Sequence, residues 1–66
     1  MSLDWQLCDG GLKARGKYDY YILVMHTRLY LGRGKNGQYD RLNTFDRGNS
    51  DIASAKRLAE AWEREE

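Results

Sequence analysis

The first side chains to consider for catalysis are the single histidine, His26, and the single cysteine, Cys8. Before covalent chemistry is possible, an imidazole needs a serine or cysteine nucleophile near it, and a thiol needs a basic neighbour. No serine or cysteine lies close to His26 in the sequence, and no basic cluster flanks Cys8. A small enzyme would need a pocket around one of them, and we predict that the protein is not an enzyme.

Metal ions, cofactors and small-molecule substrates are not expected either. The carboxylates are scattered instead of paired, and one histidine with one cysteine is not a metal-ligand cluster. Residues 32–37 combine three glycines with Arg33 and Lys35, a composition that can bind phosphate. This loop lacks the Gly-Lys-Ser/Thr ending of a phosphate-binding loop and does not lead into a helix. Its Asn36-Gly37 dipeptide instead predicts a tight hairpin turn.

The chain has 66 residues, so we expect one small domain covering residues 1–66. A single core of this size rarely supplies more than about 3 to 5 kcal/mol. One cysteine excludes an intrachain disulfide, so self-association or partner binding is the expected source of further stability. No apolar run is long enough to span a membrane, and the N-terminus lacks the basic start of a signal peptide, which predicts a cytoplasmic protein.

Residues 18–26 are apolar on both faces of a predicted strand. Side chains alternate across a strand, so each face needs its own cover. One face carries Tyr20, Ile22 and Val24, and the other carries Tyr21, Leu23 and Met25. A chain this short can hardly cover both.

Three hairpin turns are predicted around this strand. A turn at Asp9-Gly10 would place Leu7 opposite Leu12, and a turn after His26 would place Val24 opposite Leu29. The Asn36-Gly37 turn would pair Lys35 with Gln38, Arg33 with Asp40 and Leu31 with Leu42. This last register sends Tyr39 and Phe45 to the face of Tyr21, unless a bulge intervenes before Phe45.

The final segment has a helical pattern, from about residue 50 to residue 65. Asn49 or Ser50 is the expected N-cap, with Asp51 in the first turn. Apolar side chains recur at helical spacing and form one face: Ile52, Ala55, Leu58, Ala59 and Trp62.

These patterns predict an α+β fold, an antiparallel sheet of four or five strands within residues 3–46 with the C-terminal helix on one face. The helix would cover Ile22, Val24, Leu29, Leu31 and Leu42. In an alternative arrangement, the N-terminal hairpin folds back over the other face and gives a curled half-barrel with Trp5, Leu7 and Leu12 as its plug. Without that cover, the other face exposes five apolar or aromatic residues: Tyr21, Leu23, Met25, Tyr30 and Tyr39.

Two kinds of function fit such a face. A surface rich in tyrosine and methionine is typical of protein interfaces, which favours self-association or binding to another protein. Tyrosines on a sheet can also stack nucleotide bases, with Arg28, Arg33, Lys35 and Arg41 as the phosphate contacts. The net charge of only +1 weakens this second hypothesis, because phosphate attraction needs a positive surface.

A resemblance lies in the spacing of core positions over most of the chain: Trp5, Asp9-Gly10-Gly11-Leu12-Lys13-Ala14, Tyr18-Asp19-Tyr20-Tyr21-Ile22-Leu23, Tyr30-Leu31, Phe45 and Ala55-Lys56-Arg57-Leu58-Ala59-Glu60. In this spacing the chain resembles small uncharacterised proteins of bacteriophages and prophages. The resemblance implies a location in the host cytoplasm and a partner such as a host protein or a defence component. It implies no catalytic or binding residues.

A second similarity lies in Thr44-Phe45-Asp46 followed by an Ala-rich helix. This segment is similar to the DNA-binding modules of integrase N-termini and plant AP2-type domains. Those modules consist of three strands followed by a helix, and they place a basic sheet in the major groove. The similarity implies that Arg28, Arg33, Lys35 and Arg41 contact DNA. Asp19 and Asp40 interrupt that basic stripe.

Overall fold

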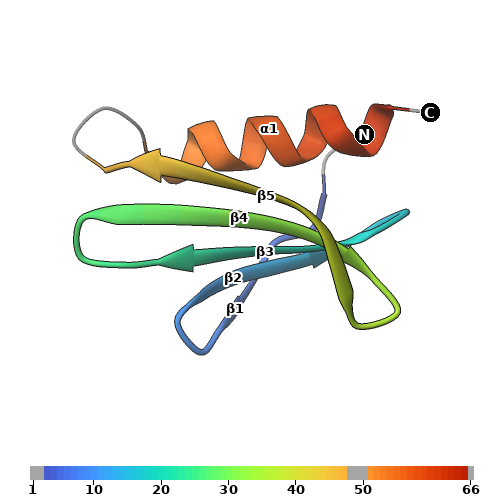
Figure 1. Ribbon diagram of the computed structural model, residues 1–66, viewed down its shortest axis with the longest axis horizontal. Coiled ribbons are helices and arrows are strands. Elements are labelled where there is room, and N and C mark those ends of the chain that lie inside the picture. Colours follow the sequence, from blue (N-terminus) through green and yellow to red (C-terminus); the bar gives the residue numbers. More distant parts are fainter. Residues whose placement is uncertain (1–2, 48–50, 66) are drawn as a thin grey trace.

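The computed structural model describes residues 3–47 and 51–65, and it contains one antiparallel sheet and one helix (Figure 1). The strands pair in sequence order, and the first and last described strands do not meet, so the sheet is open. The predicted α+β fold is confirmed. The elements are β1 (Gln6–Cys8), β2 (Gly11–Arg15), β3 (Asp19–Val24), β4 (Arg28–Lys35), β5 (Gln38–Asp46) and α1 (Ile52–Arg64).

The three predicted turns set the strand pairing. Leu7 lies opposite Leu12, Val24 opposite Leu29 and Lys35 opposite Gln38, as expected. Asn36 and Gly37 have positive φ angles of 56° and 82°, the conformation that a two-residue hairpin turn requires. Three of the four strand pairings therefore start where the predicted turns place them.

The N-terminal hairpin extends the sheet, so the alternative in which it folds back over the second face is wrong. β1 and β2 continue the sheet beyond β3. Trp5 and Leu12 pack against the core on the helix side, whereas Leu7 is 87% exposed. The second face of the sheet is left without a cover from the described residues.

A β-bulge shifts the register between β4 and β5. Gly34 lies opposite Tyr39 but Arg33 lies opposite Arg41, so Asp40 is the extra residue. A bulge of one residue moves every later side chain to the other face. The predicted pairing of Leu31 with Leu42 is therefore wrong.

The consequences of the bulge reach the core. Leu42 lies opposite Gly32 on the face turned away from the helix and is 68% exposed, so its predicted place under the helix is wrong. Asn43 lies opposite Leu31, and Phe45 packs against the core on the helix side. This is the outcome expected for Phe45 if a bulge intervened.

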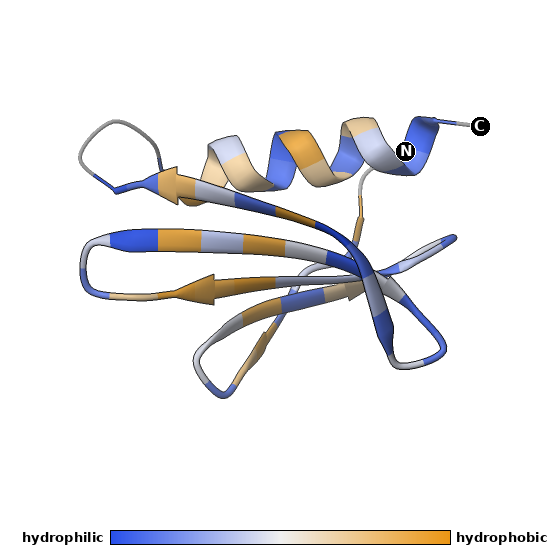
Figure 2. Ribbon diagram, viewed as in Figure 1, coloured by the Kyte–Doolittle hydropathy of each residue, from blue (hydrophilic) through white to orange (hydrophobic). Residues whose placement is uncertain are grey.

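The core lies between α1 and the sheet. It consists of Tyr20, Ile22, Leu31, Ala55, Ala59 and Trp62, with Leu29 also buried. Figure 2 shows the alternation along β4 that produces this arrangement, with apolar bands separated by polar ones. Among the described residues, no helix is long and apolar enough to cross a membrane.

The helix begins at Ile52, so Asp51, expected in the first turn, lies just before it. Asp51 is the N-cap, and its carboxylate accepts a hydrogen bond of 3.0 Å from the backbone N–H of Ser54. This bond lowers the pKa of Asp51 because it favours the charged form. The predicted caps, Asn49 and Ser50, lie outside the described residues.

Glu63 ties the last turn of α1 to the β2–β3 turn. Its carboxylate accepts hydrogen bonds from the backbone N–H of Lys17 at 2.8 Å and from the hydroxyl of Tyr20 at 2.7 Å. Burial alone would raise the pKa of Glu63, but the hydrogen bonds outweigh it and the pKa is lowered. Burial and the bond to Glu63 raise the pKa of Tyr20.

We expect Glu63→Gln to lower the free energy of unfolding at neutral pH by about 1 to 2 kcal/mol, because charge-assisted hydrogen bonds are lost. The pKa of Glu63 is lower in the folded than in the unfolded chain, so its contribution is complete at neutral pH and is lost on acidification. Urea unfolding of both proteins at neutral pH and at about pH 3 measures this. An equal difference at both pH values would contradict the assignment.

Candidate protein-binding face

The sheet face turned away from α1, here called the open face, carries a shallow apolar hollow of about 430 Å³. Two of its residues are prominently exposed, Tyr39 at 65% and Leu42 at 68%. The hollow is lined by side chains of the three last strands and one glycine: Tyr21, Leu23, Tyr30, Gly32, Tyr39 and Leu42.

Two glycines in β4 make room for Tyr39 on the open face. A Cβ atom at Gly32 would lie 3.0 Å from the Tyr39 ring, and one at Gly34 would lie 2.7 Å from the backbone carbonyl oxygen of Gln38. The ring therefore lies directly over bare backbone, as an aromatic residue does when it covers a glycine in a neighbouring strand. The floor of the hollow is backbone and aromatic ring.

Tyr21 stands at the centre of the open face. Its hydroxyl donates a hydrogen bond of 2.8 Å to the backbone carbonyl of Asp9, which fixes the ring against the β1–β2 turn. Burial, followed by the neighbouring Cys8, raises the pKa of this hydroxyl. Lys13 lies opposite Tyr21 on β2.

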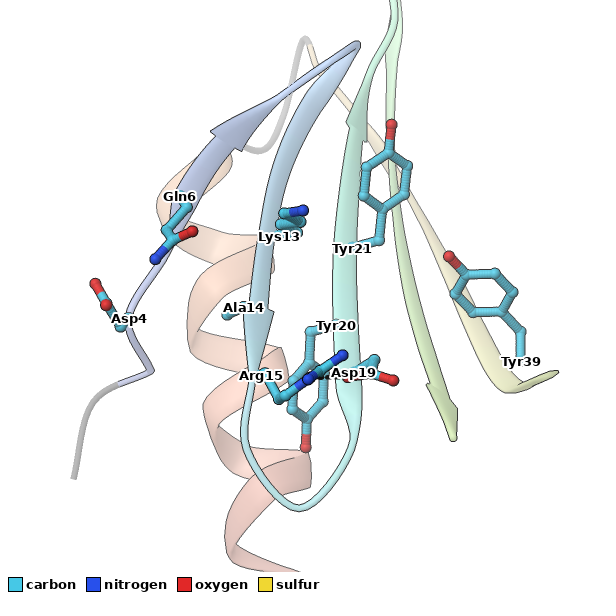
Figure 3. Close-up of a pocket in the computed structure, with 9 residues that line it drawn as sticks. All are labelled: Asp4, Gln6, Lys13, Ala14, Arg15, Asp19, Tyr20, Tyr21 and Tyr39. Atoms are coloured by element: carbon cyan, nitrogen blue, oxygen red, sulfur yellow. Dashed lines mark hydrogen bonds and ion pairs between the residues drawn. The ribbon is translucent and has the colours of Figure 1, made fainter. Parts of the chain in front are cut away.

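A second hollow, of about 510 Å³ and more polar, continues from Tyr21 toward the N-terminal strands. Figure 3 shows Lys13, Tyr21 and Tyr39 on this side of the sheet and Tyr20 turned toward the helix. Arg15 and Asp19 form an ion pair of 2.9 Å at its margin. The open face thus has an apolar centre with charged residues at its border.

Arg33, a predicted nucleic-acid contact, is largely buried and already engaged. Its guanidinium donates two hydrogen bonds to Asp40, of 3.0 and 2.9 Å, and lies 4.1 Å from the centre of the Tyr18 ring. The predicted Arg33–Asp40 pair is confirmed, although the bulge and not direct opposition brings the two together. The hydrogen bonds raise the pKa of Arg33 and lower that of Asp40.

The other predicted basic contacts do not share one face with each other. Arg41 lies on the helix side, 3.2 Å from Glu65 and above the Trp62 ring. Lys35 lies near the Tyr18 ring, whereas Arg28 is two residues before Tyr30 in β4 and so lies on the open face. The structure therefore does not bring these four side chains into one stripe, and nucleic-acid binding stays a prediction.

The two residues considered for catalysis occupy turns and strand ends. His26 is exposed in the turn between β3 and β4, where its carbonyl oxygen accepts a hydrogen bond from Arg47. Cys8 ends β1 beside the Asp9-Gly10 turn and is partly exposed. The described residues include no group of three or more side chains that could hold a metal ion.

Four of the five predicted interface residues lie together in the apolar hollow: Tyr21, Leu23, Tyr30 and Tyr39. Met25 follows β3 and is 48% exposed, but it does not line the hollow. Leu42 and Gly32 were not predicted there. The extra residue between the Asn-Gly turn and Leu42 does not alter the alternation of apolar and polar residues in the sequence. Only the strand pairing in the structure shows that Leu42 lies on the open face.

Comparison with known protein families, with curated proteins and with solved structures finds no match to this chain. The resemblance to bacteriophage proteins accordingly stays a prediction, and the open face is the feature of the molecule that indicates a function.

Proposed function

We propose that this protein is a non-enzymatic protein-binding module of the cytoplasm that acts through its open face, by self-association or by binding another protein of a host cell. The observation that carries the proposal is the apolar hollow of Tyr21, Leu23, Tyr30, Tyr39 and Leu42, which the described residues leave uncovered. Aromatic residues are enriched and charges depleted at the centres of protein interfaces, and this surface has the same composition.

Burial of this surface by a binding partner is favourable in free energy. Burial of apolar area yields about 25 cal/mol for each Å² removed from water. A domain of 66 residues has little stability in reserve, so a contact that buries Tyr39 and Leu42 is a sizeable addition. The backbone-lined floor and the fixed Tyr21 ring also mean that little side-chain freedom is lost there on binding.

We expect Leu23→Glu to reduce self-association while the monomer stays folded, because it places a charge in the apolar hollow without touching the helix-side core. Sedimentation velocity over a concentration series measures this against wild type. Leu7→Glu is the matched control, since Leu7 is exposed outside the open face.

Wild type and Leu7→Glu should show a mass that rises above the 7.7 kDa monomer with concentration, and Leu23→Glu should show a smaller rise. If Leu23→Glu associates as strongly as wild type, the open face is not the contact surface.

A further inference from the structure

β5 forms one edge of the sheet, because no strand lies beyond it in the described residues. In an antiparallel ladder, alternate residues turn their backbone groups toward one neighbour and then toward the other. The N–H of Met25 donates to the carbonyl of Arg28, so Arg28, Tyr30 and Gly32 bond to β3. The intervening residues of β4 therefore bond to β5.

The same alternation shows which backbone N–H and carbonyl groups of β5 do not bond to β4. Leu31 and Arg33 of β4 lie opposite Asn43 and Arg41, whose backbone groups are used in the ladder. Leu42, between them, turns its N–H and carbonyl outward from the sheet, and Thr44 does likewise. Among the described residues, no turn, loop or cap hydrogen bond engages either residue.

β5 carries a bulge at Asp40 and charges at Asp40, Arg41 and Asp46, but the stretch between them, residues 42–45, lacks the usual protection against strand pairing. Natural edge strands carry charges, prolines or a covering element. Residues 42–45 read Leu-Asn-Thr-Phe, with no charge and no proline, and α1 contacts mainly β3 and β4. Leu42 also lines the apolar hollow, so the edge is continuous with the open face.

We propose that β5 pairs antiparallel with β5 of a second copy of this chain, with Leu42 opposite Leu42 of that copy. The inference rests on the proposed function in one respect, that the protein self-associates. Two sheets of five strands would then join into one sheet of ten strands, with both helices on the same side.

The charges of β5 favour this register over the two neighbouring ones. Equivalent faces of the two chains must stay on the same side of the joined sheet, so one strand can slide along the other only in steps of two residues. Each such step moves the centre of the pair by one residue. Centring the pair on Arg41 would oppose two arginines, and centring it on Asn43 would oppose Asp40 with Asp46. Centring it on Leu42 opposes Arg41 with Asn43 and joins the apolar hollows of the two copies.

The test compares Leu42→Pro with Leu42→Val by sedimentation velocity. Proline removes the outward N–H, which the internal ladder does not use, so it is tolerated at an edge. Valine keeps both the N–H and an apolar side chain. We expect Leu42→Pro to weaken association roughly tenfold or more, and Leu42→Val to associate nearly as wild type does. Equal association of the two variants would overturn the proposal.

A second experiment tests the register without altering the backbone. Leu42→Lys and Leu42→Glu should each associate weakly alone, because like charges would face each other, and an equimolar mixture should recover association. A mixture no stronger than either variant alone would overturn the Leu42-centred register.

Different results would contradict the β5 pairing and the binding role of the open face. If Leu42→Pro matches wild type while Leu23→Glu does not, the β5 pairing is wrong and the open face stands. If Leu23→Glu matches wild type while Leu42→Pro does not, the open face is wrong as a contact and the β5 pairing stands. A wild type that stays at 7.7 kDa at every concentration overturns the β5 pairing.

Discussion

Trp62→Ala is expected to unfold the protein at 25 °C. Trp62 is only 6% exposed and belongs to the buried cluster with Tyr20, Ile22 and Leu31 between α1 and the sheet. Replacing a buried tryptophan with alanine costs about 3 to 5 kcal/mol, which is comparable to the whole stability of a single core this small. The indole also lies under the guanidinium of Arg41 at 5.1 Å, and that contact is lost as well.

Far-UV circular dichroism and thermal melting measure this effect. Arg64→Ala is the control, because Arg64 lies in the same helical turn but is exposed. The control should melt within a few degrees of wild type, whereas Trp62→Ala should show no cooperative transition. A cooperative Trp62→Ala melt close to that of wild type would mean that α1 contributes little to the core.

Gly11→Ala should also be severely destabilising, by about 3 kcal/mol, for a different reason. A Cβ atom at Gly11 would overlap the backbone carbonyl oxygen of Ile22 on the neighbouring strand. A backbone atom cannot rotate away as a flexible side chain can, so β2 and β3 must separate locally. The N-terminal hairpin would then detach from the sheet.

Gly37→Ala is the comparison, because nothing lies within 4 Å of a Cβ atom there. Its positive φ of 82° still makes alanine unfavourable, by about 1 to 2 kcal/mol. In urea unfolding, the free energy of unfolding should therefore be lowest for Gly11→Ala, higher for Gly37→Ala and highest for wild type. The reverse order of the two variants would contradict the close approach of β2 and β3.

The turns and the helix could be predicted because their determinants are local. Asp9-Gly10 and Asn36-Gly37 fix hairpins through the positive φ that glycine and asparagine tolerate, and the spacing of Ala55, Ala59 and Trp62 fixes the buried side of α1. These features specify their own geometry within a few residues.

The bulge at Asp40 could not be predicted because its cause is not local. Asp40 leaves the ladder and pairs with Arg33, which is itself held against Tyr18. The Arg33–Asp40 pair could be inferred from the sequence, but it is compatible with direct opposition as well as with a bulge. Leu42 and Phe45 exchange faces between those two cases, so the composition of the open face depended on one residue.

The most direct test of the open face is a dilution series followed residue by residue with amide NMR spectra. Diluting the wild-type protein should shift the amide signals of Leu23, Tyr30 and Tyr39, while those of Arg57 and Arg64 on the exposed side of α1 stay constant. Shifts confined to α1, with the open-face signals unchanged, would contradict the central claim that this face is where the protein binds.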